Sequence, residues 1–107
     1  RRLRDLAHRV EPSLPEGVYV QFQGPQYETP AEVRMAGILG GDLVGMYTTL
    51  ETLAAREAGM EVLGLSLVTN AAAGLSGSAL DHTEVLQAGR DAGPRLAALL
   101  AGIVGEL

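Results

Sequence analysis

The chain has 107 residues, of which 47% are hydrophobic, and a formal net charge of −5 with neither lysine nor cysteine. This composition is typical of one globular domain, excludes a disordered chain, and offers no basic face to nucleic acid. The absence of cysteine excludes disulfides and thiolate sites, which agrees with a reducing compartment, and no apolar run is long enough to span a membrane.

The first third of the chain predicts a helix, a strand and a second helix. Leucine, alanine and valine recur at helical spacing over residues 1–10, and the prolines that follow end this helix. Valine, tyrosine and phenylalanine dominate residues 17–23, which predicts a strand. Thr29 and Glu32 form a capping box around a proline at the first helical position, which predicts a helix over residues 30–39.

The middle of the chain predicts two strands with a helix between them. Residues 42–46 are short and apolar, as in a strand. Thr48 and Glu51 form a second capping box and predict a helix that a glycine ends after residue 58. Residues 61–70 are apolar on both faces, which is typical of a central strand with helices on both sides of the sheet.

Residues 70–80 predict a loop of glycine, serine and alanine, and Asp81–Glu84 is a third capping box. It opens a long helix through residue 107, in which Pro94 should produce a kink. The alternation predicts an α/β fold with a mainly parallel or mixed sheet flanked by helices. Three strands would leave edges and apolar area exposed, and the chain begins without methionine. We therefore expect an incomplete domain, completed by further sequence, an oligomer or both.

Ligands of such sheets bind beyond the carboxyl ends of the strands, where residues 24–29, 46–48 and 69–75 are expected to meet. The polar candidates there are Tyr27, Glu28, Tyr47, Thr48, Thr69, Asn70 and His82. With two histidines and no P-loop, dinucleotide fingerprint or nucleophile elbow, neither a metal nor an organic cofactor is indicated.

Each candidate also has a purely structural interpretation. Glu28 is a carboxylate beside a helix N-terminus, although the capping box already satisfies that helix end. Asn70 suits a turn, His82 a solvated first helical turn, and Met46 the core. Taken together, a carboxylate, an amide and an imidazole suit a ligand with donor and acceptor edges, such as a nucleobase.

Four blocks of sequence carry a resemblance to a known family. They are Gly24-Pro-Gln-Tyr-Glu-Thr-Pro-Ala-Glu32, Gly45-Met46 before a capped helix, Val62-Leu-Gly-Leu-Ser-Leu-Val-Thr-Asn70 and His82-Thr-Glu-Val-Leu-Gln-Ala-Gly89. In order and spacing they resemble the trimeric, 6-oxopurine-specific purine nucleoside phosphorylases, with residues 1–107 matching the C-terminal part of the single domain. The resemblance implies a phosphorylase/hydrolase-like fold, a homotrimer, and a cytoplasmic role in purine salvage.

The resemblance also implies the reaction. It is phosphorolysis of inosine, guanosine and their deoxy forms to the free purine and (deoxy)ribose 1-phosphate, with orthophosphate as co-substrate and no cofactor. Glu28 matches the carboxylate that accepts a hydrogen bond from N1 of a 6-oxopurine and disfavours adenine. Asn70 and His82 match the catalytic residues, which bind purine N7 and O6 and the ribose 5′-hydroxyl. Tyr27 matches an aromatic beside the purine, and Met46 a residue packed on the sugar.

Two positions depart from the family pattern. Tyr47 stands where a phosphate-binding serine is usual, with Thr48 or Thr49 as partial substitutes, and Ala71 stands where a larger aliphatic residue is usual. The family's other phosphate ligands lie in the N-terminal part of the domain. Two alternatives therefore stay open: a non-catalytic purine-binding remnant whose phosphate site Tyr47 closes, and a generic α/β interaction domain without a ligand.

Overall fold

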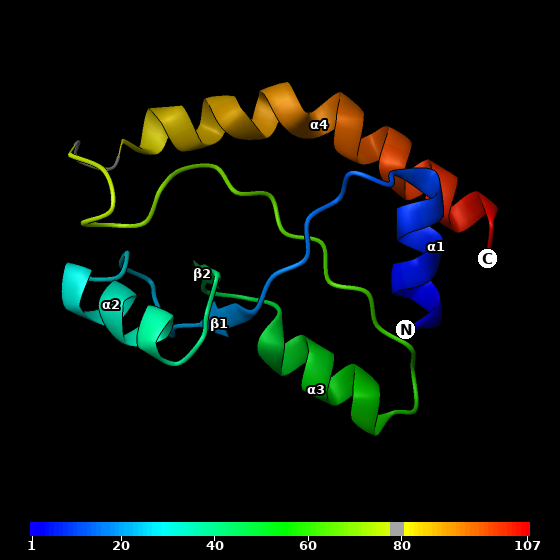
Figure 1. The fold of residues 1–107 in the computed structure, drawn as a ribbon, viewed down its shortest axis with the longest axis horizontal. Helices are drawn as coiled ribbons and strands as arrows, with labels where there is room; N and C mark the ends of the chain where they lie inside the picture. The colour runs from blue at the N-terminus through cyan, green and yellow to red at the C-terminus, as the bar shows by residue number, and fades with distance from the viewer. Residues whose placement is uncertain (78–80) are drawn as a thin grey trace.

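The computed structural model describes residues 1–77 and 81–107. Its elements, in chain order, are α1 (Arg2–Val10), β1 (Tyr19–Gln21), α2 (Pro30–Ile38), β2 (Leu43–Gly45), α3 (Thr49–Glu57) and α4 (His82–Gly105). Figure 1 shows α4 along one side of the molecule, α1 beside its C-terminal end, and the two strands near α2 and α3. The α/β class expected from the sequence is confirmed. Of the loop expected over residues 70–80, the last three residues lie outside the described ones.

The sheet is parallel, as the β-α-β order of its elements predicts. β1 and β2 pair in the register Tyr19↔Leu43, Val20↔Val44 and Gln21↔Gly45, with α2 as the connection between them. Parallel strands end at the same edge of a sheet, so the loop after β1 and the turn after β2 leave it side by side. This edge positions the candidate site.

The third strand expected over residues 61–70 is wrong for this structure, in which the described residues form a two-stranded sheet. The stretch is extended but unpaired, and its apolar side chains remain 37% to 62% exposed at Val62, Leu65, Leu67 and Val68. A strand needs a neighbouring backbone for its N–H and C=O groups, and β1 and β2 pair with each other. The pattern of a buried strand is therefore present without the elements that would cover it.

The helix starts follow the local signals. In the box before α2, the Thr29 N–H donates to Glu32 Oε2 at 2.6 Å, and the Glu32 N–H donates to Thr29 Oγ1 at 3.3 Å. At α3 the Thr48 N–H donates to Glu51 Oε2 at 3.0 Å, and at α4 Asp81 Oδ1 accepts from the Thr83 N–H at 2.8 Å. α4 runs unbroken through its internal proline and curves along its length (Figure 1).

The main core lies between α1 and α4, away from the sheet. Leu6, Ala7 and Ile103 are buried there, with Leu63 and Leu99 packed against them. The total accessible surface is 7777 Å², whereas a compact protein of this mass exposes roughly 5,700 Å². The chain thus covers its own apolar surface incompletely. Among the described helices, none is both long enough and apolar enough to cross a membrane.

Candidate functional site

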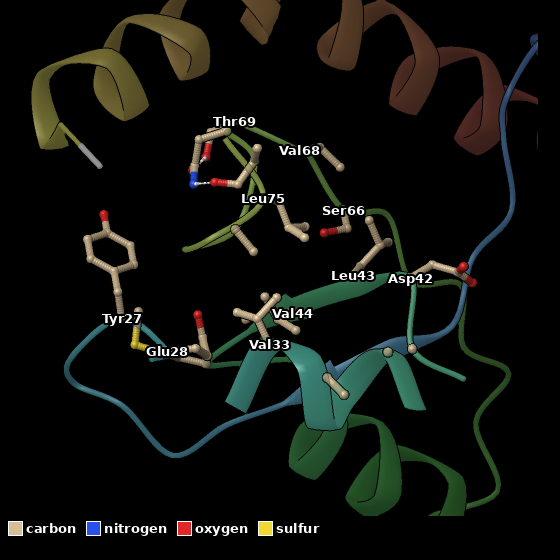
Figure 2. A pocket seen from close by; sticks show the side chains of 18 of the residues that line it. Tyr27, Glu28, Val33, Asp42, Leu43, Val44, Ser66, Val68, Thr69 and Leu75 are labelled. Atoms are coloured by element: carbon tan, nitrogen blue, oxygen red, sulfur yellow. Dashed lines mark hydrogen bonds between the residues drawn. The ribbon is translucent and has the colours of Figure 1, made fainter. Parts of the chain in front are cut away.

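A cavity of about 450 Å³ runs along β2 to the carboxyl edge of the sheet, between α2, β2 and the extended segment at residues 66–72. This is within the range of roughly 300–1,000 Å³ that small-molecule sites occupy. Its walls include Val33, Val44 and Leu75, and Figure 2 shows these apolar side chains around the opening. The cavity therefore combines apolar walls with the polar candidates that the sequence places at this edge.

Five of the predicted site residues line this cavity: Tyr27, Glu28, Met46, Thr69 and Asn70. They come from three separate segments. The parallel pairing of β1 and β2 brings the first two to one edge, and the unpaired segment at residues 66–72 supplies the third. In Figure 2, Tyr27 and Glu28 lie on one side of the cavity and Thr69 lies across from them. The same two residues also line a smaller cavity of about 230 Å³, together with other residues of the loop after β1.

The Glu28 carboxylate is available to a ligand. It is half-buried, and no side chain or backbone group of the described residues is hydrogen-bonded to it. Thr29 and Glu32 form the capping box on their own, so the expectation that Glu28 is not needed for the cap is confirmed. A carboxylate held on a cavity wall without a partner is an acceptor that a donor edge of a ligand could satisfy.

Asn70 has a defined side-chain orientation. The Thr69 hydroxyl donates to Asn70 Oδ1 at 2.7 Å, and Asn70 Nδ2 donates to the backbone oxygen of Ala71 at 2.9 Å. Both side chains are half-buried in the cavity wall, and Figure 2 marks the hydrogen bonds at Thr69. One N–H of the amide is left over as a donor.

Two cavity residues escape the sequence reasoning. Gly24 has φ +68°, and a side chain there would collide with Met46, whose Cγ would lie 2.9 Å from the added Cβ. Glycine therefore allows Met46 to lie against the turn that carries Tyr27. Arg34 of α2 lines the larger cavity, whereas Gly24 lines the smaller one, and no carboxylate of the described residues pairs with Arg34. The Gly-Pro dipeptide in the sequence was a signal for Gly24. No local sequence pattern indicates Arg34.

Three predicted residues are not among those that line the cavity: Tyr47, Thr48 and His82. Tyr47 is 69% exposed, and His82 is exposed as the first residue of α4. The first N–H groups of α3 are already engaged, because Thr48 donates to Glu51 and the Thr49 N–H donates to Gln21 Oε1 at 2.8 Å. In this arrangement the helix N-terminus offers an anion fewer free donors than the sequence suggests.

In the described part of the chain, no three histidine or acidic side chains gather where they could hold a metal ion. The arrangement instead offers one free carboxylate, one oriented amide, an aromatic ring and a thioether around an apolar cavity. Such a set is suited to binding a flat heterocycle by its polar edge.

The comparisons with known proteins agree with this geometry. Residues 1–105 match the phosphorylase superfamily. A purine nucleoside phosphorylase from Cellulomonas sp. is 72% identical over 102 residues, which are 95% of this chain and 36% of that protein. A 6-oxopurine nucleoside phosphorylase from Pyrococcus furiosus is 49% identical over 76 residues, 71% of this chain and 29% of that protein.

Solved structures give the same result for the fold. A Schistosoma purine nucleoside phosphorylase in complex with hypoxanthine superposes with a TM-score of 0.93 at 37% identity, covering 100% of this chain and 41% of that one. The Schistosoma mansoni protein in complex with adenosine gives 0.92 at the same identity, with 100% and 41% covered. This chain therefore spans about two fifths or less of the length of the proteins that it matches.

Proposed function

Because this chain belongs to the phosphorylase superfamily, we propose that it is the C-terminal, purine-recognising part of an enzyme that cleaves 6-oxopurine nucleosides with orthophosphate. An oxygen of orthophosphate attacks C1′ of the ribose as the bond from C1′ to the purine nitrogen breaks. The products are ribose 1-phosphate, or its deoxy form, and the free purine. The observation that carries the proposal is the cavity in which the unpaired Glu28 carboxylate faces the segment of Asn70.

Glu28 is the proposed determinant of the base. An ionised carboxylate accepts a charge-assisted hydrogen bond from the N1–H of hypoxanthine or guanine, whereas N1 of adenine is itself an acceptor. The name of the Pyrococcus furiosus relative supports this substrate class. Selectivity is a difference of two affinities, so the adenosine complex of the Schistosoma mansoni relative is compatible with a preference for 6-oxopurines.

Asn70 and His82 are the proposed catalytic residues. The departing purine gathers negative charge, so a donor from Asn70 to N7 becomes stronger in the transition state than in the ground state. His82 would bind the ribose 5′-hydroxyl, which requires the start of α4 to approach the cavity more closely than it does in this structure. Tyr27 would lie beside the purine, and Met46 against the sugar.

The phosphate site is the part of the proposal for which this chain supplies fewer residues. The chain spans about a third of the Cellulomonas relative, so phosphorolysis, a homotrimer and a cytoplasmic role in purine salvage belong to the whole protein. Within this chain, Thr48 and the phenol of Tyr47 are the proposed phosphate contacts at the start of α3. No metal or organic cofactor takes part in the proposed reaction.

A second candidate function is purine binding without phosphorolysis. The occupied N–H groups of Thr48 and Thr49 favour it, together with a tyrosine at the position where a small hydroxyl would hold the anion. Purine binding needs only the residues that line the cavity, and both candidate functions use these residues.

Phosphate-dependent cleavage of inosine by the full-length gene product separates the two. We expect activity in the natural sequence and a lower KM for phosphate in Tyr47→Ser, because a short hydroxyl replaces a ring. Tyr47→Phe serves as the matched control that keeps the ring and removes only the phenol oxygen. Activity in Tyr47→Ser alone would favour the purine-binding remnant. Absence of inosine cleavage in the natural sequence and in both variants, with hypoxanthine still bound, would exclude phosphorolysis.

A further inference from the structure

We propose that Thr69 is a positioning residue, whose hydroxyl holds the Asn70 carboxamide with its N–H side toward the ligand. The proposal rests on the proposed function, in which Asn70 donates to purine N7. Thr69 does not itself need to touch the base. Its contribution is to restrict the rotation of the neighbouring amide before the ligand arrives.

The two ends of the Asn70 amide have different partners. Asn70 Oδ1 accepts from the Thr69 hydroxyl at 2.7 Å, and Asn70 Nδ2 donates to the backbone oxygen of Ala71 at 2.9 Å. A carbonyl oxygen can only accept, so the Ala71 carbonyl decides which end of the amide is nitrogen. The Thr69 hydroxyl can donate or accept, and in this orientation it must donate. Together the two bonds fix the plane of the amide.

This orientation has a direct chemical consequence for a purine. One hydrogen of Nδ2 is used by the Ala71 carbonyl, and the second remains free to donate to a ring nitrogen. A flipped amide would present Oδ1 to the lone pair of N7, and two acceptors would face each other. Because Thr69 and Asn70 are half-buried in the cavity wall, a loosened amide would not be compensated fully by water.

The test compares two variants and two ligands. Thr69→Val has nearly the same shape as threonine and lacks the hydroxyl, whereas Thr69→Ser keeps it. Hypoxanthine offers the N7 acceptor, and 7-deazahypoxanthine has a C–H group in its place. Affinities are measured by calorimetry on the full-length gene product, and the quantity of interest is the ratio of the two affinities. A general loss of folding would weaken both ligands alike and leave this ratio unchanged.

We expect the natural sequence and Thr69→Ser to favour hypoxanthine. In Thr69→Val this preference should fall by about fivefold to tenfold, the change produced by losing one neutral hydrogen bond. An unchanged preference in Thr69→Val would overturn the positioning role while leaving the proposed function intact. Equal affinity for both ligands in the natural sequence would overturn it as well, because no N7 bond would then exist. Absence of binding to either purine would overturn the proposed function and this inference together.

Discussion

The side-chain oxygen of Gln21, the last residue of β1, accepts a 2.8 Å hydrogen bond from the backbone N–H of Thr49, the first residue of α3. This bond spans 28 positions of sequence and closes the turn that follows β2. Within that turn Thr48 has φ +88°, a conformation that a residue with a β-branched side chain rarely adopts. Such a conformation persists where neighbouring contacts hold it, and Gln21 supplies one of them.

Replacing Gln21 with methionine keeps the length of the side chain and removes its hydrogen-bond acceptor. We expect the free energy of unfolding to fall by at most about 1 kcal/mol, because the Thr49 N–H loses the shorter of its two hydrogen bonds and keeps the 3.1 Å bond to the backbone oxygen of Tyr47. Hydrogen exchange at the Thr49 amide should become faster. The control is Gln23→Met, two positions further along the chain, where the glutamine side chain is exposed. Unchanged exchange at Thr49 in Gln21→Met would show that the bond does not hold the start of α3.

Glu28 and Glu32 allow a matched pair of substitutions four positions apart. Glu28→Ala should leave the free energy of unfolding unchanged, since no described residue is hydrogen-bonded to its carboxylate. It should weaken hypoxanthine binding roughly tenfold to a hundredfold, as expected for a hydrogen bond to a charged group. Glu32→Ala should lower the stability by about 0.5–1 kcal/mol, because it removes the acceptor of the Thr29 N–H. Denaturant unfolding and calorimetry measure both effects, and a stability loss in Glu28→Ala would contradict this division of roles.

The features predictable from sequence are those whose partners lie within a few residues. Thr29 and Glu32 are three positions apart, and their capping box forms as expected. The start of α3 is confirmed by the bond from the Thr48 N–H to Glu51. The start of α4 is confirmed by a bond from the Thr83 N–H to Asp81, and not by the reciprocal box expected between Asp81 and Glu84. The parallel order of β1 and β2 follows from the helix between them. That order also brings Glu28 and Met46 to one cavity, whereas Asn70 reaches the cavity on the unpaired extended segment.

The features that escaped prediction depend on contacts between distant residues. Residues 61–70 have the composition of a central strand, yet composition does not state whether a pairing partner is present, and in the described chain none pairs with them. The bond from Thr49 to Gln21 and the close approach of Gly24 to Met46 join separate loops. Neither has a periodic or local signature, so only the folded arrangement reveals them.

Arg2 of α1 and Glu61 form an exposed ion pair that ties α1 to the start of the extended segment. The hydrogen bond from the Arg2 guanidinium lowers the pKa of Glu61 below the ordinary carboxyl value. The pair therefore contributes stability above the pKa that Glu61 has when unfolded, and this contribution is lost as the pH falls through its lower folded pKa. Arg2→Gln should raise the Glu61 pKa toward the ordinary value in a carboxyl NMR titration, and high salt should reduce the difference. Arg4→Gln is the control, since Arg4 pairs with Asp5 and Glu16. An ordinary Glu61 pKa in the natural sequence would contradict the pairing.

At Gly102, α4 packs closely against Val10 of α1. A Cβ there would lie 2.6 Å from Cγ1 of Val10, a branched side chain with little freedom to move away. Gly102→Ala should therefore lower the free energy of unfolding by about 1–2 kcal/mol, because overpacking of about 1–3 kcal/mol outweighs a helix-propensity gain of up to about 1 kcal/mol. Gly89→Ala is the control in the same helix: nothing lies within 4 Å of its added Cβ, so it should gain stability. Denaturant unfolding of both variants measures the difference, and equal gains would mean that α1 does not pack on α4 at this point.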